Sequence, residues 1–194
     1  MGYVALVIVA VLVIWTVAVY NRLRTHKNQV ENAFAQIDVQ LKRRHDLIPN
    51  LVEVARGYMQ HEAQTLEAVI RARGDAVSAA DKARLAPGQG AAMGALMNAE
   101  QVLGGQMGRL MALAEAYPTL KADARMQQLS EEITSTENRI GFARQAYNDQ
   151  VLDFNNEAGQ FPDVLVARLA GFAHMGMLES TQNEQERAVP QVKF

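Results

Sequence analysis

The first 20 residues form an unbroken apolar run, MGYVALVIVAVLVIWTVAVY, that carries no charged side chain. Built as a helix rising about 1.5 Å per residue, Gly2 to Tyr20 extends roughly 28 Å, close to the ~30 Å hydrocarbon core of a bilayer. Arg22, Arg24 and Lys27 follow at once, and no basic residue precedes the run. The run therefore predicts one transmembrane helix over residues 1–20, and we expect the three basic side chains to contact lipid headgroups.

The same charge asymmetry predicts the orientation. By the positive-inside rule, residues 21–194 lie in the cytoplasm and the N-terminus lies outside. Periplasmic placement of the domain is an alternative that runs against this asymmetry. A cleaved signal peptide is another alternative, with Thr16-Val17-Ala18 as its cleavage site. Such a peptide would have a basic start and a shorter apolar run of about 7–15 residues.

Composition narrows the class of the remaining chain. The chain has no cysteine, which excludes disulfides, thiolate metal sites and cysteine nucleophiles. It carries 19 basic and 21 acidic residues, and this balance gives no electrostatic basis for binding nucleic acid. Aromatic residues make up only 6%. The abundance of alanine, leucine, methionine, glutamine and glutamate favours helices over strands.

Apolar residues recur at helical spacing along the whole domain. The pattern predicts an all-α fold, in which the membrane helix continues into an elongated antiparallel bundle of about four helices. We expect a kink or a short break at Pro49, because proline lacks the backbone N–H that a helix interior needs. The further helices are expected over 51–85, 91–116 and 120–157, with a short amphipathic segment over 162–172. The expected division is a membrane helix at 1–20, a bundle at 21–172 and a flexible C-terminal tail at 173–194.

Residues 36–53 read QIDVQLKRRHDLIPNLVE, and this string resembles the signature of the LemA family. Further matches follow in order: Tyr117-Pro118, Thr136-Glu137-Asn138-Arg139-Ile140, Phe161-Pro162 and the ending Pro190-x-Val192-x-Phe194. Phe34 departs from the pattern, since the family commonly has tryptophan there. The resemblance implies an N-terminal anchor, a helical-bundle domain and association with the bacterial inner membrane. It implies no established enzymatic activity.

No motif in the chain predicts catalysis. His61-Glu62 begins like the zinc-protease motif HExxH, but Thr65 stands where the second histidine is needed. The phosphate-binding pattern GxxxxGK[ST] and the nucleophile pattern GxSxG do not occur. We therefore expect no catalytic residue, no bound metal, no cofactor and no small-molecule substrate.

The charged part of residues 36–53 is the candidate functional surface. Its members are Asp38, Lys42, Arg43, Arg44, His45, Asp46, Pro49 and Glu53. Arg44 falls on the apolar stripe, where an unpaired charge is costly, so we expect a carboxylate from residues 120–157 to meet it. The candidates are Glu131, Glu132 and Glu137. Lys42 lies roughly 33 Å beyond Tyr20 if the rod stands upright, too far to sense headgroup charge.

Three roles stay open for this surface: fixing the register of the bundle, contacting a partner or a second copy, and contacting lipid. Together these features predict a membrane-anchored, non-enzymatic scaffold or adaptor that self-associates and can engage a membrane protein of unknown identity. One alternative is a membrane-remodelling or lipid-contacting protein whose bundle lies on the bilayer. Another is an enzyme or sensor that uses a polar pocket around His45 and Asp46.

Overall fold

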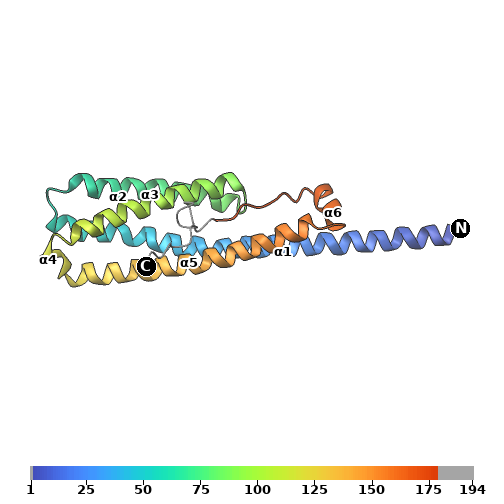
Figure 1. Ribbon diagram of the computed structural model, residues 1–194, viewed down its shortest axis with the longest axis horizontal. Helices are drawn as coiled ribbons and strands as arrows, with labels where there is room; N and C mark the ends of the chain where they lie inside the picture. Colours follow the sequence, from blue (N-terminus) through green and yellow to red (C-terminus); the bar gives the residue numbers. More distant parts are fainter. Residues whose placement is uncertain (1, 179–194) are drawn as a thin grey trace, which may run out of the picture.

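The computed structural model describes residues 2–178, and within them every regular element is a helix. The helices are α1 (Gly2–Tyr58), α2 (Ala63–Leu85), α3 (Gly90–Ala114), α4 (Pro118–Lys121), α5 (Ala124–Gly159) and α6 (Asp163–Leu169). The four long helices run side by side as an elongated bundle, and the N-terminal part of α1 extends alone beyond it (Figure 1). The predicted all-α fold with an N-terminal apolar helix is confirmed.

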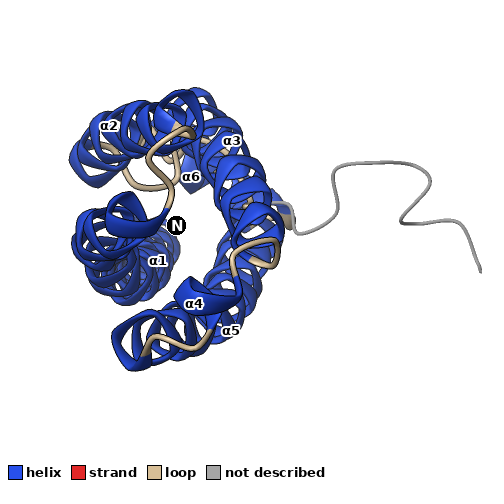
Figure 2. Cartoon of the chain, turned by 90° about the vertical axis from the view of Figure 1, so that its left-hand side faces the viewer, coloured by secondary structure: helices blue, strands red, loops and turns tan. Residues whose placement is uncertain are grey.

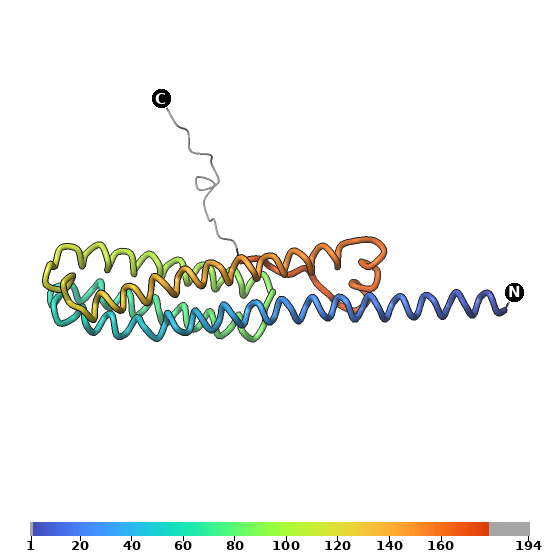
Figure 3. Tube along the Cα trace, turned by 90° about the horizontal axis from the view of Figure 1, so that it is seen from below, coloured from blue at the N-terminus to red at the C-terminus, as the bar shows by residue number. Residues whose placement is uncertain are grey.

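Helix α1 joins the apolar segment to the bundle without a break. It spans 57 residues and contains Pro49, so the helix has no break at this proline, whereas the kink stays a prediction. The chain instead leaves the helix after Tyr58, next to Gly57, a residue that disfavours helices by about 1 kcal/mol relative to alanine. One helix thus forms both the candidate membrane span and a full edge of the bundle, as the tube in Figure 3 shows.

The apolar start of α1 is long and hydrophobic enough to cross a membrane, judged by length and composition. Between Gly2 and Ala18 its side chains are exposed except for the half-buried Trp15, and burial against other helices begins at Val19. Seen along its length, the bundle closes around a core that α1, α2, α3 and α5 share (Figure 2).

Two large apolar clusters are stacked along the bundle, and a third, smaller cluster joins α1 to α6. The outer cluster contains Ile48, Leu103 and Ile133, and the cluster nearer the apolar segment contains Leu41, Leu96 and Ile140. On α1, α3 and α5 the nearest buried members of the two clusters are seven residues apart, about two helical turns. The residues in that gap form the candidate site described below.

After α6 the chain turns back along the bundle, where residues 173–178 contact α5. The side chain of Asn155 bonds both the N–H and the carbonyl of Met175, at 2.9 and 3.0 Å, and Asn148 does the same for Leu178 at 2.8 and 2.7 Å. The hydroxyl of Tyr147 donates to the carbonyl of Gly176 at 2.9 Å. The division of the chain at residue 172 stays a prediction, and its tail from 179 to 194, with the ending Pro190-x-Val192-x-Phe194, lies outside the described residues.

Gly176 allows this segment to approach the α2–α3 loop. Its N–H donates to the carbonyl of Gly88 at 2.8 Å, and a Cβ at Gly176 would lie 2.7 Å from the Cα of Gly90. Gly176→Ala is therefore expected to release residues 173–178 while α5 keeps its structure, because backbone cannot yield as a side chain can. Hydrogen exchange should show faster exchange at the amides of Met175 and Leu178. Gly94→Ala, where the added Cβ meets nothing within 4 Å, is the control; equal exchange in both variants would contradict the close packing.

Candidate functional site

A buried polar layer crosses the bundle between the two apolar clusters. Its members are Arg44 and His45 on α1, Glu100 on α3 and Thr136 on α5, each less than 9% exposed. Each lies between apolar core residues on its own helix, for example Arg44 between Leu41 and Ile48. The chain therefore places charges where neighbouring turns place leucine and isoleucine.

Glu100 is the centre of this layer. Its Oε1 lies 2.8 Å from Nε2 of His45, and its Oε2 forms an ion pair with Nη2 of Arg44. A carboxylate only accepts hydrogen bonds, so the neutral ring of His45 donates through Nε2–H. Nη1 of Arg44 also lies 3.7 Å from the half-exposed carboxylate of Glu137 on α5. Three helices are therefore joined through one guanidinium.

Burial sets the protonation states in the layer. The pKa of His45 is lowered to about 4, first by burial and then by the guanidinium groups of Arg44 and Arg73. Burial also lowers the pKa of Arg44 to about 10, while the charge of Glu137 opposes this shift. At neutral pH the arginine stays a cation and the histidine is neutral. The ring thus acts as a hydrogen-bond donor without adding a second buried positive charge.

The carbonyl that Pro49 leaves without its helical donor has another partner, which helps the helix to continue through this proline. A proline at position 49 leaves the carbonyl of His45, four residues earlier, without its helical N–H donor. Nε of Arg73, on α2, donates to this carbonyl at 2.5 Å. A side chain from the neighbouring helix thus replaces the missing backbone hydrogen bond, which also ties α2 to the polar layer.

This arrangement predicts a coupling between two substitutions. Arg73→Met is expected to destabilise the bundle by about 1.5 kcal/mol, because it strands the His45 carbonyl. In a Pro49→Ala background the alanine N–H can donate a hydrogen bond to that carbonyl. Arg73→Met should then lower the free energy of unfolding by less. A double-mutant cycle from urea unfolding, followed by far-UV circular dichroism in detergent, measures the difference. Equal costs in both backgrounds would show that Arg73 and Pro49 act independently.

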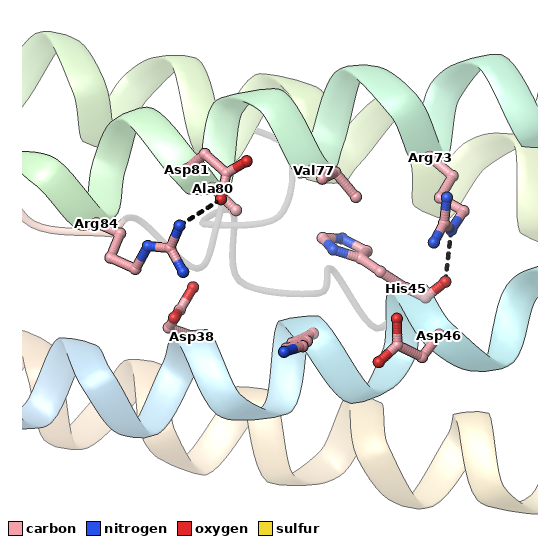
Figure 4. A pocket seen from close by; sticks show the side chains of 9 residues that line it. Asp38, His45, Asp46, Arg73, Val77, Ala80, Asp81 and Arg84 are labelled. Carbon is pink, nitrogen blue, oxygen red and sulfur yellow. Dashed lines mark hydrogen bonds and ion pairs between the residues drawn. The ribbon is translucent and has the colours of Figure 1, made fainter.

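A polar groove opens beside the layer, between α1 and α2 (Figure 4). It has a volume of about 220 Å³, and His45 forms part of its wall. Three carboxylates and three cationic side chains line it: Asp38, Asp46, Asp81, Lys42, Arg73 and Arg84. With His45 neutral, these formal charges cancel, so the groove favours neither an anion nor a cation by net charge. Across residues 2–178, no group of three or more histidine, aspartate or glutamate side chains is placed to hold a metal ion.

The structure separates the predicted surface into two environments. Arg44 and His45 are buried, whereas Lys42, Arg43, Asp46 and Glu53 are exposed and Asp38 and Pro49 are half-buried. Arg43 lies 3.8 Å from Glu132 and Glu53 lies 3.6 Å from Arg56. Of the three carboxylates expected for Arg44, Glu137 is near it, but the closer partner is Glu100. The roles predicted for this set stay predictions.

Sequence reasoning missed Glu100 and Arg73. Glu100 was detectable, since it falls at helical spacing among Leu96, Leu103 and Met107, as Arg44 does on its own helix. Arg73 gives no such signal, because its bond to a backbone carbonyl depends on how α2 packs against α1.

The three basic residues after the apolar run have different surroundings. Arg22 forms ion pairs with Glu157 of α5 and Asp163 of α6. Arg24 is exposed, and Lys27 is half-buried beside the hollow under the α2–α3 loop. Their predicted contact with lipid headgroups stays a prediction.

Comparison with known proteins gives a consistent result. The sequence model of the LemA family matches residues 33–194, most of the chain. The chain is 27% identical over 168 residues to magnetosome protein MamQ 2 of Paramagnetospirillum magneticum and 25% identical over 168 residues to MamQ of Magnetospirillum gryphiswaldense. These matches cover 79% of this chain and 62% of each relative. Protein LemA of Metamycoplasma hominis is 24% identical over 165 residues, covering 85% of this chain and 71% of that protein.

Proposed function

The chain belongs to the LemA family, and from that premise we propose that it is a membrane-anchored, non-enzymatic scaffold or adaptor that self-associates at the bacterial inner membrane. The observation that carries the proposal is the continuity of α1 from the apolar segment to Tyr58. A single helix holds the bundle at a fixed distance and direction from the anchor. The MamQ relatives are magnetosome proteins, but the match leaves over a third of their length uncovered, so a magnetosome role is not proposed for this chain.

The geometry of α1 supports an upright bundle. Arg44 lies 24 residues beyond Tyr20, which corresponds to about 36 Å along a helix. A bundle lying flat on the bilayer would need a bend between Tyr20 and Lys42, and α1 is helical throughout that stretch. The alternative of a membrane-remodelling protein with a flat bundle is therefore disfavoured. Salt-sensitive crosslinks between Lys42 and lipid, measured with the full-length protein in anionic vesicles, would support this alternative instead.

We assign the polar layer a role in the register of the bundle. Sliding one helix past another by a turn would remove Glu100 from Arg44 and leave both charges buried without partners, which is costly. Apolar clusters tolerate such slips far better, because leucine and isoleucine can exchange neighbours. The layer thus favours one alignment of α1, α3 and α5, and a scaffold needs one defined surface.

The orientation can be tested directly. We propose that the bundle is cytoplasmic, because the basic residues follow the apolar segment and none precedes it. Fusing alkaline phosphatase or a fluorescent protein that matures only in the cytoplasm to the C-terminus separates the two orientations. We expect fluorescence without phosphatase activity; the reverse result would place the bundle on the other side.

Self-association has a candidate contact on α5. Phe142 is 74% exposed on the outside of the bundle, where a large apolar side chain gains free energy if a second copy covers it. We expect light scattering of the detergent-solubilised protein to show oligomers whose population rises with concentration. Phe142→Ser should weaken them, and Leu85→Ser, at a similarly exposed leucine, is the control. A strictly monomeric wild type over a wide concentration range would contradict self-association.

A further inference from the structure

Helix α6 lies beside the end of the apolar segment of α1, at the edge where the bundle stops (Figures 1 and 3). Its buried residues Val166 and Ala167 pack against Val19 and Leu23, with Trp15 and Phe172 around them. Val19 belongs to the predicted membrane span. An element almost 150 residues away in sequence therefore contacts the part of α1 that we place in the bilayer.

The contacts define the direction of α6. At its start, Asp163 forms an ion pair with Arg22, the first charged residue after the apolar run. At its end, Leu169 and Ala170 line a hollow with Thr16 and Val17, about six residues deeper. Six residues of helix correspond to roughly 9 Å. Helix α6 thus descends from the level of Arg22 toward the level that hydrocarbon occupies.

Large apolar side chains are exposed on and just before α6. Leu169 is 90% exposed and Leu165, one turn earlier, is 51% exposed; Phe161, just before the helix, is 81% exposed. The hollow between α6 and α1 is also almost wholly apolar, with Thr16 and Tyr20 contributing its polar atoms. In water these neighbouring apolar surfaces would stay hydrated, which is unfavourable.

The turn after α6 suits a membrane interface because its backbone donors are already bonded. The N–H groups of Ala170, Gly171 and Phe172 donate to carbonyls of Val166, Arg168 and Ala167. Gly171 has a φ of +75°, the left-handed conformation with which glycine commonly ends a helix. Unbonded amides are costly in a lipid environment, and this tip presents none at those three positions. The long side chain of Arg168 can extend back to the phosphates.

We propose that α6 is a second membrane contact: its tip, Leu165 to Gly171, inserts into the interfacial region of the leaflet next to the bundle, with Leu165 and Leu169 among the acyl chains. The occupant of this apolar surface is the lipid bilayer, because the surface continues the bare surface of α1 at the same depth. The proposal rests on the membrane anchoring of α1. With two membrane contacts, α1 and α6, the bundle has a fixed rotation and depth relative to the bilayer. With α1 alone, the bundle could rotate about the axis of that helix.

The test uses the full-length protein in lipid vesicles and exploits the absence of native cysteine. Single cysteines are placed by Leu169→Cys, Leu85→Cys and Ile8→Cys and labelled with an environment-sensitive fluorophore. Leu85, 85% exposed on α2, matches Leu169 in residue type and exposure, and Ile8 reports insertion of α1. Quenching is measured with aqueous iodide and with lipids that carry a nitroxide near the headgroup.

We expect the label at position 169 to be quenched by the lipid nitroxide and to be several-fold less accessible to iodide than the label at position 85. If position 169 is as accessible to iodide as position 85 while position 8 is protected, the proposal for α6 is overturned and the anchor stands. If position 8 itself is open to iodide, the membrane anchoring on which both rest is wrong.

Discussion

Glu100→Leu is expected to destabilise the bundle by about 3–5 kcal/mol, because it leaves the guanidinium of Arg44 buried without its main partner. The carboxylate of Glu137 cannot take over, since it is half-exposed and 3.7 Å from the guanidinium. The free energy of unfolding is measured by urea titration of the full-length protein in detergent, with far-UV circular dichroism as the signal.

Two further variants make this result diagnostic. Arg44→Met combined with Glu100→Leu removes both charges, so the double variant should recover most of the lost stability or exceed the wild type. Glu137→Gln is the control, because it removes a carboxylate that is partly solvated. It should lower the free energy of unfolding by at most about 1 kcal/mol. If Glu100→Leu costs no more than Glu137→Gln, Arg44 does not depend on Glu100. A double variant as unstable as the single one would indicate a packing defect instead.

Acidification is expected to remove about 3 kcal/mol of stability between pH 6.5 and pH 4 through His45 alone. In the unfolded chain this imidazole binds a proton near its ordinary pKa of 6.5, whereas in the folded bundle burial holds its pKa at about 4. Over that interval the unfolded state carries more protons, so each pH unit costs up to about 1.4 kcal/mol. Above about pH 7.5 His45 is neutral in both states and the contribution is constant.

Burial lowers the pKa of His45 most, and the net effect of the charges around it acts in the same direction. Arg44 and Arg73 disfavour a second positive charge, whereas Asp46 and Asp81 oppose them more weakly. The carboxylate of Glu100 is shared with Arg44, which already neutralises it. His45→Gln keeps a donor toward Glu100 but cannot titrate, so its stability should decline less steeply below pH 6.5. Parallel stability curves for the two proteins would show that His45 is not buried in the neutral form.

Most helices could be predicted from the sequence because their signal is local. The helix expected over 51–85 is wrong in its first part, since residues 51–58 belong to α1 and α2 begins at Ala63. Residues 91–116 and 120–157 were predicted as helices, and α3 and α5 occupy nearly those ranges. The break predicted as one alternative at Pro49 does not occur, and the reason lies in the tertiary structure. The rule that proline interrupts a helix holds when the stranded carbonyl has no other donor, and here Arg73 supplies one from another helix.

For the polar layer the sequence indicated Arg44 but not its main partner, Glu100. Arg44 stood out as a charge on an apolar stripe, and this pattern correctly required a buried partner. The partner could not be chosen from the spacing, because the pattern of one helix contains no information on which neighbour faces it. The expected carboxylates all lay in residues 120–157, whereas Glu100 comes from α3.

By itself the sequence determined that this chain is helical, that it begins with a segment able to cross a membrane, and that its signature resembles one family. These properties follow from residue type and period along a single segment. Only the tertiary structure decided that Arg44, His45 and Glu100 form one buried layer, that Arg73 completes the helix at Pro49, and that α6 lies beside the apolar segment of α1. Each of these contacts joins residues from different helices, and it is packing in three dimensions that brings them together.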